Sequence, residues 1–109
     1  MEYIKFNDWQ KLDLRIGEIL EVHDHPNADK LFVIKVDIGE KKINLVAGLK
    51  SYYDKKELVG KKVIIFTNLE QKTLRGIKSE GMILAADDEN GKVVLLTIDS
   101  DIKNGSKIR

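Results

Sequence analysis

The sequence contains no cysteine and a single proline among its 109 residues, and aromatic residues make up only 6%. The lack of cysteine excludes a disulfide framework and a zinc site built on thiolates, and it is compatible with the reducing cytoplasm. No apolar run approaches the roughly 18 residues that a membrane-spanning helix needs, and the mixed, polar start of the chain does not resemble a signal peptide. We therefore expect a cytoplasmic protein without a membrane segment.

Charge of one sign is also scarce, because 19 basic and 18 acidic residues leave a net charge of +1. Proteins that hold nucleic acid through counterion release usually carry a basic excess, so any such function here depends on local clustering. Residues 50–62 carry a local charge of +3, whereas residues 1–23 carry −2. Positive charge is thus segregated along the chain.

Residues that would form a catalytic or metal centre are missing as well. The sequence has no Ser/His/Asp or Cys/His set, no phosphate-cradling glycine loop and no acidic metal cluster. His23 and His25 lie near Asp24 and Asp29, but without a cysteine or a third histidine they do not favour a metal site. We expect a protein that is not an enzyme and needs no cofactor or metal.

What the chain does contain is a series of short strands in one domain, residues 1–109. Apolar residues over 14–22 predict a long first strand, and a slip in their phase near Gly17 predicts a bulge there. Strict alternation over 32–38 and 43–47, with a tight turn at Gly39, predicts a hairpin.

The second half of the chain continues the pattern. Ser51 or Asp54 is placed to cap a short helix that Gly60 ends. The unbroken apolar centre of 62–68 predicts a strand buried on both faces, and a fifth strand is expected to begin at Met82.

The chain ends are interpreted in the same way. An Asn-Gly turn at 87–91 leads into a last long strand over 92–98. Near the N-terminus, Asn7 or Asp8 is placed to cap one helical turn that carries Trp9.

This order predicts an all-β protein: a five-stranded Greek-key barrel of the OB-fold type, with a short helix between strands three and four and short terminal extensions. A closed barrel removes open edges, which suits a small domain with short strands. An SH3-like barrel is the competing interpretation, and the helix after strand three favours the OB-fold.

Between two apolar runs lies a segment rich in cations and polar groups, residues 68–82. It holds Lys72, Arg75 and Lys78. Cations on a loop between buried strands are typical of a binding surface on a rigid scaffold, not of a catalytic centre.

Five ordered motifs spread over nearly the whole chain resemble one family. They are Asp13-Leu14-Arg15-Ile16-Gly17-Glu18-Ile19, His25-Pro26-Asn27-Ala28-Asp29-Lys30-Leu31, Val46-Ala47-Gly48-Leu49, Asn68-Leu69 and Leu74-Arg75-Gly76-Ile77-Lys78-Ser79-Glu80-Gly81-Met82. Together they resemble the tRNA-binding domain at the C-terminus of methionyl-tRNA synthetases, which also occurs as free-standing dimeric tRNA-binding proteins.

The resemblance implies an OB-fold and a non-catalytic module that binds tRNA by its shape and backbone, near the outer corner of the molecule. It implies a homodimer that presents one composite RNA surface. The chain would act alone or as an accessory (beta) subunit, with a methionyl-tRNA synthetase catalytic subunit as a partner.

The site residues implied by the motifs are mainly cations. We expect Arg75, Lys72, Lys78 and Lys30 to contact phosphates, Arg75 first because its fork can bridge two oxygens. The alternative for Arg75 is a solvated side chain or an ion pair with Glu80.

Three uncharged residues complete the expected RNA-binding set. Asn68 and Ser79 either donate to RNA or hold the backbone around them, and Met82 packs against a base or sugar or fills the core.

The segment departs from the family pattern at three positions. The family usually has a Lys-Pro or Ala-Pro pair after Asn-Leu and a further lysine before Leu-Arg-Gly, where this chain has Glu70-Gln71 and Thr73. Residues 68–82 then carry only +1, so modest RNA affinity is expected.

Two further observations bear on function. No strand shows a row of exposed aromatic rings, which argues against a general single-strand binder and for recognition of structured RNA. The segments 9–15 and 104–108 also resemble the small dimeric CsaA-type secretion chaperones, which bind unfolded polypeptide. Those chaperones generally lack the His-Pro-x-Ala-Asp-Lys and Leu-Arg-Gly motifs, so this remains the alternative.

Overall fold

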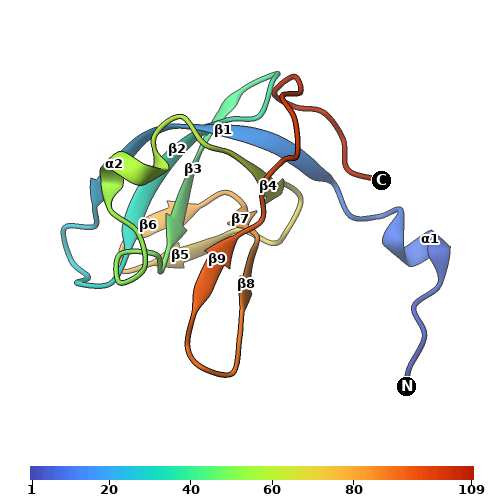
Figure 1. Ribbon diagram of the computed structural model, residues 1–109, viewed down its shortest axis with the longest axis horizontal. Helices are drawn as coiled ribbons and strands as arrows, with labels where there is room; N and C mark the ends of the chain where they lie inside the picture. The colour runs from blue at the N-terminus through green and yellow to red at the C-terminus, as the bar shows by residue number, and fades with distance from the viewer.

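Five strands of the chain curl into one antiparallel sheet, from which a long hairpin and a terminal extension project (Figure 1). The computed structural model describes all residues 1–109. Its elements are α1 (Phe6–Trp9), β1 (Leu14–Asp24), β2 (Phe32–Asp37), β3 (Lys42–Ala47), α2 (Lys55–Leu58), β4 (Lys62–Phe66), β5 (Lys72–Leu74), β6 (Ile77–Ser79), β7 (Met82–Ile83), β8 (Ala85–Asp87) and β9 (Val93–Leu95). The all-β order with α2 between β3 and β4 confirms the OB-like barrel.

The main sheet has five strands in the order β3-β2-β1-β4-β7. The predicted hairpin is confirmed, because β2 pairs with β3 from Phe32 opposite Ala47 to Asp37 opposite Lys42. Inward side chains of these strands, among them Ile34, Val36 and Leu45, are fully buried and form the barrel core.

The barrel closes between β3 and the end of β6, through side chains as well as backbone. The Ser79 hydroxyl oxygen accepts a hydrogen bond from the Val46 N–H at 3.0 Å. The Glu80 carboxylate accepts one from the Asn44 N–H at 2.7 Å, and the Glu80 N–H donates to the Asn44 carbonyl at 2.9 Å.

The bulge expected near Gly17 is not there; β1 bulges between Ile19 and Glu21 instead. Gly17 pairs regularly with Val63. The slip in phase has another cause, because Leu14 and Ile16 face a second apolar cluster outside the barrel, whereas Ile19 faces the core. Gly17 is needed for close packing, since a Cβ there would lie 2.5 Å from Val36 Cγ1.

Both short helices lie where the sequence predicted them, but only one has the predicted N-cap residue. At α2, Asp54 is the N-cap, and its N–H donates to the Glu57 carboxylate at 2.8 Å. At α1 the N-cap is Lys5, not Asn7 or Asp8, and no side chain caps it. Neither helix is long and apolar enough to span a membrane.

The last strand is also shorter than expected. Only residues 93–95 of the predicted 92–98 are strand, paired with β8 in a hairpin outside the main sheet. The remainder contacts β4 at an isolated bridge between Thr97 and Val63, and the Thr97 hydroxyl donates to the Lys62 carbonyl at 2.8 Å. The C-terminal segment then runs along β1, where the Ile16 N–H donates to the Ser106 carbonyl at 2.9 Å and the Ile108 N–H to the Leu14 carbonyl at 2.9 Å.

Candidate nucleic-acid interface

The cation-rich segment is a β-hairpin and not the loop that the sequence suggested. β5 pairs with β6 through Lys72 opposite Ser79, Thr73 opposite Lys78 and Leu74 opposite Ile77. β5 and β6 have three residues each, which is too short for the alternation of apolar and polar residues to be recognised in the sequence. The hairpin lies below the curled sheet, between β3 and the β8–β9 hairpin (Figure 1).

Two residues with positive φ make the turn of this hairpin. Arg75 has φ +52° and Gly76 has φ +90°. Both central residues of a type I′ turn need positive φ, and Asn-Gly is the pair that adopts it with least strain. Arg75 is the one non-glycine residue of the chain with positive φ. A bulky side chain therefore occupies a strained backbone position at the tip, which is a common property of functional sites.

The hairpin has a buried face and an outward face. Directly opposite residues of an antiparallel pair share a face. Ser79 is buried, and Leu74 and Ile77 are half-buried, so this face packs on the barrel. Thr73 and Lys78 are exposed and lie side by side on the other face. The outward face therefore presents Lys78 to solvent next to a neutral neighbour.

A buried histidine ties the β1–β2 loop to the hairpin. His25 is 4% exposed, its Nε2 lies 2.9 Å from the Leu74 carbonyl oxygen, and its Nδ1 accepts a hydrogen bond from the Asn27 N–H at 3.0 Å. These two contacts require the tautomer with its proton on Nε2. Sequence reasoning considered His25 only as a metal ligand and missed this contact, which joins residues 49 positions apart.

The four cations expected to bind RNA are free of ion pairs. None of Lys30, Lys72, Arg75 and Lys78 is within salt-bridge distance of a carboxylate. Arg75 does not pair with Glu80, because that carboxylate is held by β3. Free cations keep their full charge available to a phosphate.

Other cations that the sequence placed in a basic cluster are partly neutralised. Asp24 accepts a hydrogen bond from Lys55 Nζ at 3.0 Å and lies 3.3 Å from Lys50 Nζ. The Lys55 hydrogen bond, with the charges of both lysines, lowers the pKa of Asp24 below its ordinary value. The Asp24 carboxylate of β1 thus partly neutralises the local charge of +3 that residues 50–62 carry.

The structure favours the backbone-holding role for the two neutral polar residues. Ser79 is 6% exposed; its hydroxyl accepts from the Val46 N–H and donates to the Gly81 carbonyl at 2.9 Å, so the hydroxyl is engaged within the fold. Asn68 is exposed, but its amide accepts from the Asp13 N–H and donates to the Lys11 carbonyl, both at 2.7 Å.

Asn68 belongs to a polar cluster at the start of β1. Asp13 accepts hydrogen bonds from the Thr67 hydroxyl at 2.9 Å and from Arg15 Nε at 2.8 Å. Burial alone would raise the pKa of Asp13, but these hydrogen bonds and the charges of Arg15 and Lys107 outweigh it and lower that pKa. The cluster anchors the chain where it enters the barrel.

Met82 is 43% exposed and does not fill the core. It lines an apolar groove beside the hairpin, together with residues of the β3–α2 connection. The structure thus brings Lys72, Arg75 and Lys78 onto one hairpin and ties the loop that carries Lys30 to that hairpin, with Met82 at its base.

Comparison with known proteins matches this geometry to one family. A model described as "Putative tRNA binding domain" matches residues 14–107. Methionine–tRNA ligase from Pyrococcus horikoshii is 59% identical over all 109 residues, and that from Methanocaldococcus jannaschii is 51% identical over the same length. The chain spans only 15% and 17% of these two relatives.

Solved structures superpose on the whole chain. A "MetRS related protein" from Pyrococcus horikoshii, 28% identical, has a TM-score of 0.94, with all of both chains covered. Chaperone CsaA from Bacillus anthracis, 30% identical, has a TM-score of 0.89 over 99% of this chain and all of the other. CsaA from Picrophilus torridus, 35% identical, has 0.88 over 98% of this chain and all of the other.

Proposed function

The chain belongs to the tRNA-binding domain family, and from that premise we propose that it is a non-catalytic tRNA-binding protein that recognises the shape and backbone of tRNA. Phosphates are bound by Arg75, Lys72 and Lys78 of the β5–β6 hairpin, with Lys30 of the β1–β2 loop beside them. Binding of this kind positions the RNA and reads little of its sequence.

The single observation that carries this proposal is Arg75. Its guanidinium is unpaired, and its backbone holds a left-handed conformation that a glycine or asparagine would adopt with less strain. A phosphate would supply the partner that the protein does not, and the guanidinium fork suits two phosphate oxygens at once.

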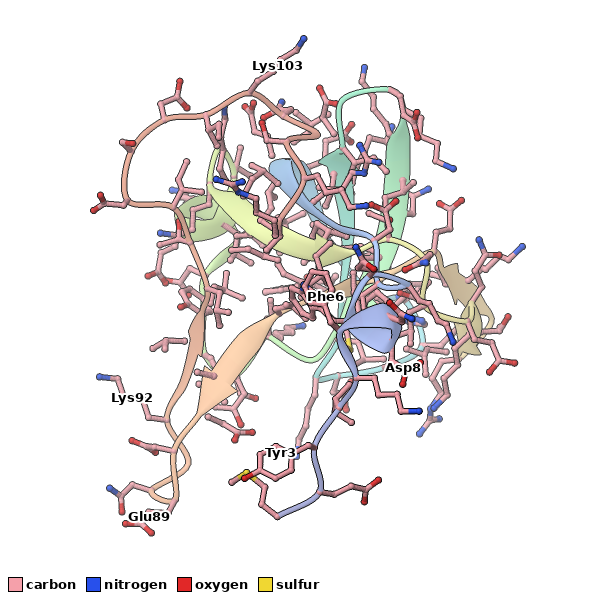
Figure 2. All side chains as sticks on the ribbon, turned by 90° about the vertical axis from the view of Figure 1, so that its right-hand side faces the viewer. Tyr3, Phe6, Asp8, Glu89, Lys92 and Lys103 are labelled. Atoms are coloured by element: carbon pink, nitrogen blue, oxygen red, sulfur yellow. The ribbon has the colours of Figure 1, made fainter.

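One hairpin offers few cations, so we propose that two copies act together in a homodimer. The N-terminal segment supplies an apolar surface for pairing, with Tyr3 87%, Ile4 72% and Phe6 69% exposed. Figure 2 shows Phe6 facing the viewer with no segment over it, and Tyr3 beyond the barrel on the extended N-terminal segment. A second copy would bury these rings and double the phosphate contacts available to one tRNA.

The similarity to methionine–tRNA ligases supports a place in aminoacylation. We propose that the module delivers or retains tRNA for a methionyl-tRNA synthetase catalytic subunit, in the cytoplasm where that reaction takes place. The enzyme would supply the chemistry, and this module would raise the local concentration of tRNA.

A second candidate function is that of a CsaA-type chaperone. The observation in its favour is the superposition on two CsaA structures, together with the exposed apolar residues of the N-terminal segment. Unfolded polypeptide would be the ligand. The free cations of the hairpin have no role in that function, which is why it stands second.

One titration separates the two. The protein is mixed with tRNA, duplex DNA of equal charge and an unfolded peptide at physiological salt, and binding is followed by fluorescence anisotropy. We expect tRNA to bind most tightly, with an affinity that falls as salt rises. Tighter binding of the peptide than of tRNA would contradict the tRNA-binding proposal and favour the chaperone function.

A further inference from the structure

An apolar groove of about 380 Å³ opens on the surface of the barrel where β3 ends. Its walls come from the end of β3 and the connection that follows, from β7, and from the β8–β9 hairpin. The lining residues that matter here are Val46, Gly48, Tyr52, Met82, Asp87 and Val93. The volume lies within the range of small-ligand pockets.

The groove is held open by hydrogen bonds from neighbouring residues. The Tyr53 hydroxyl oxygen accepts a hydrogen bond from the Leu95 N–H at 3.1 Å, which fixes the β8–β9 hairpin against the β3–α2 connection. The N–H groups of Tyr52 and Tyr53 both donate to the Leu49 carbonyl, at 2.9 and 3.0 Å. The two walls are therefore positioned before any ligand arrives.

Two large side chains in the groove are left unused by the fold. Tyr52 is 47% exposed and Met82 is 43% exposed, whereas the adjacent Tyr53 packs against the core and binds β9. A flat ring and a polarisable thioether in the same groove suit the face of another ring.

Polar groups at the groove suit the edge of such a ring. Neither the N–H nor the C=O of Gly48 has a hydrogen-bond partner within the chain, and Gly48 is exposed. The Asp87 carboxylate forms no ion pair. A carboxylate repels phosphate but accepts a hydrogen bond from the amino group of a base.

Two contacts connect the groove wall to the segments that carry the cations proposed to bind the RNA backbone. Ser79, which is paired with Lys72, binds Val46 in the groove wall. On the other side, Leu31 follows Lys30, and its Cδ2 would be 3.9 Å from a Cβ at Gly48. Cations on these two connected segments and the apolar groove between the segments match a nucleotide, whose phosphate is anionic and whose base is flat. An apolar peptide segment would leave that charge unmatched.

We propose that this groove takes one unpaired base of the bound RNA, stacked on Tyr52 and Met82, with the amino group of adenine, cytosine or guanine directed to Asp87. This deepens the proposed tRNA-binding function and rests on it. The module then has two kinds of contact: hairpin cations that hold the phosphates, and a groove that selects for an unpaired nucleotide.

The chain has two methionines, so methyl-labelled methionine gives two signals in an NMR spectrum. Met82 reports on the groove, and Met1, which is fully exposed, serves as the internal control. On addition of tRNA we expect a ring-current shift of the Met82 methyl signal and a smaller change at Met1. The same titration is run with an unfolded peptide.

Variants test the stacking by affinity. Tyr52→Ala should weaken tRNA binding by about tenfold, the usual value of one base–aromatic stack. It should leave the salt dependence unchanged, because a base contact releases no counterion. Tyr52→Phe keeps the ring and should bind normally. The matched control is Val94→Ala, which removes methyl groups from an exposed residue of β9 that does not line the groove.

A further variant fills the groove without disturbing the fold. Gly48→Ala adds one methyl group in ordinary contact with Leu31, and its backbone needs no positive φ. We expect native stability and several-fold weaker tRNA binding.

The outcomes distinguish a failure of the base site from a failure of the proposed tRNA-binding function. If tRNA binds with the expected salt dependence while Met82 does not shift and Tyr52→Ala binds normally, the groove is not a base site, and the backbone interface stands. If the peptide shifts Met82 and tRNA does not, the groove belongs to polypeptide binding. If tRNA does not bind at all, both proposals fail.

Discussion

The buried ring of His25 contacts the backbone carbonyl of Leu74 at 2.9 Å, immediately before the strained Arg75 turn. This contact links the two loops that carry the proposed phosphate-binding cations, Lys30 on one and Arg75 on the other. The two loops are thus tied to each other by a buried side chain. This arrangement leads to the following predictions.

Arg75→Ala should weaken tRNA binding by about tenfold and reduce the slope of affinity against salt by about one unit. The loss should be similar for all tRNAs, because the contact is with phosphate. Filter binding at several salt concentrations measures both quantities. Unchanged affinity and slope would remove Arg75 from the interface.

At position 75, a substitution that stabilises the turn should weaken RNA binding. Arg75→Asn creates the Asn-Gly pair that type I′ turns prefer, so the free energy of unfolding should rise by about 1 kcal/mol while RNA affinity falls. Denaturant unfolding provides the measurement. A variant less stable than the parent would show that the turn is not strained.

Replacing His25 should disorder the proposed RNA interface, because its ring supports the β5–β6 hairpin at Leu74. His25→Ala leaves a cavity and unpaired backbone groups at Leu74 and Asn27, which should cost about 1–3 kcal/mol of stability. It should also weaken tRNA binding. The matched control is His23→Ala, because His23 is exposed and pairs only with Glu21, so little change is expected. Equal effects of the two variants would deny His25 its linking role.

Adding charge beside Lys78 should strengthen binding. Thr73→Lys places a second cation opposite Lys78 on the outward face, so affinity should rise several-fold and the salt slope should steepen by about one unit. Ser100→Lys adds the same charge at an exposed site outside the hairpin, and it separates the local effect from that of net charge. An equal gain from both would mean that the hairpin is not the contact surface.

Asp13 should make stability depend on pH. Its pKa is lower in the folded protein than in the unfolded chain, so its contribution is complete above the ordinary carboxyl pKa of about 4 and disappears as pH falls below it. Asp13→Asn should therefore be less stable than the parent at pH 7, and the difference should shrink in acid. Asp99→Asn, at an exposed carboxylate without hydrogen bonds, should show no such difference at any pH.

The N-terminal segment should control assembly. Phe6→Asp places a charge in the apolar surface proposed for pairing, so it should shift the protein towards the monomer and weaken tRNA binding. Light scattering after size-exclusion chromatography gives the mass. A parent protein that is itself monomeric at micromolar concentration would contradict the proposed homodimer.

Much of the architecture could be predicted from local sequence patterns. Alternation over residues 32–38 and 43–47 identified the hairpin, and Asp54 was correctly placed as a helix cap. Patterns of this kind depend on burial of one face and on caps, which neighbouring residues determine. The bulge predicted near Gly17 was wrong because the pattern reports burial alone. A change of phase shows that the strand changes the face that it buries, but it does not show whether a bulge or a second apolar cluster is the cause. Here Leu14 and Ile16 pack under the C-terminal segment, on the side of β1 away from the core.

The sequence by itself determined the order of the main strands along the chain, the family motifs and the positions of the cations Lys72, Arg75 and Lys78. Only the tertiary structure decided which polar groups remain available to a ligand. Ser79 is used by Val46, Asn68 by the entry to β1, and His25 by Leu74, in contacts that join residues 33 to 57 positions apart. A hydrogen bond between distant segments leaves no period in the sequence, because its partners are brought together by closure of the barrel. Closure likewise leaves Arg75 without an ion pair and Tyr52 exposed in the groove.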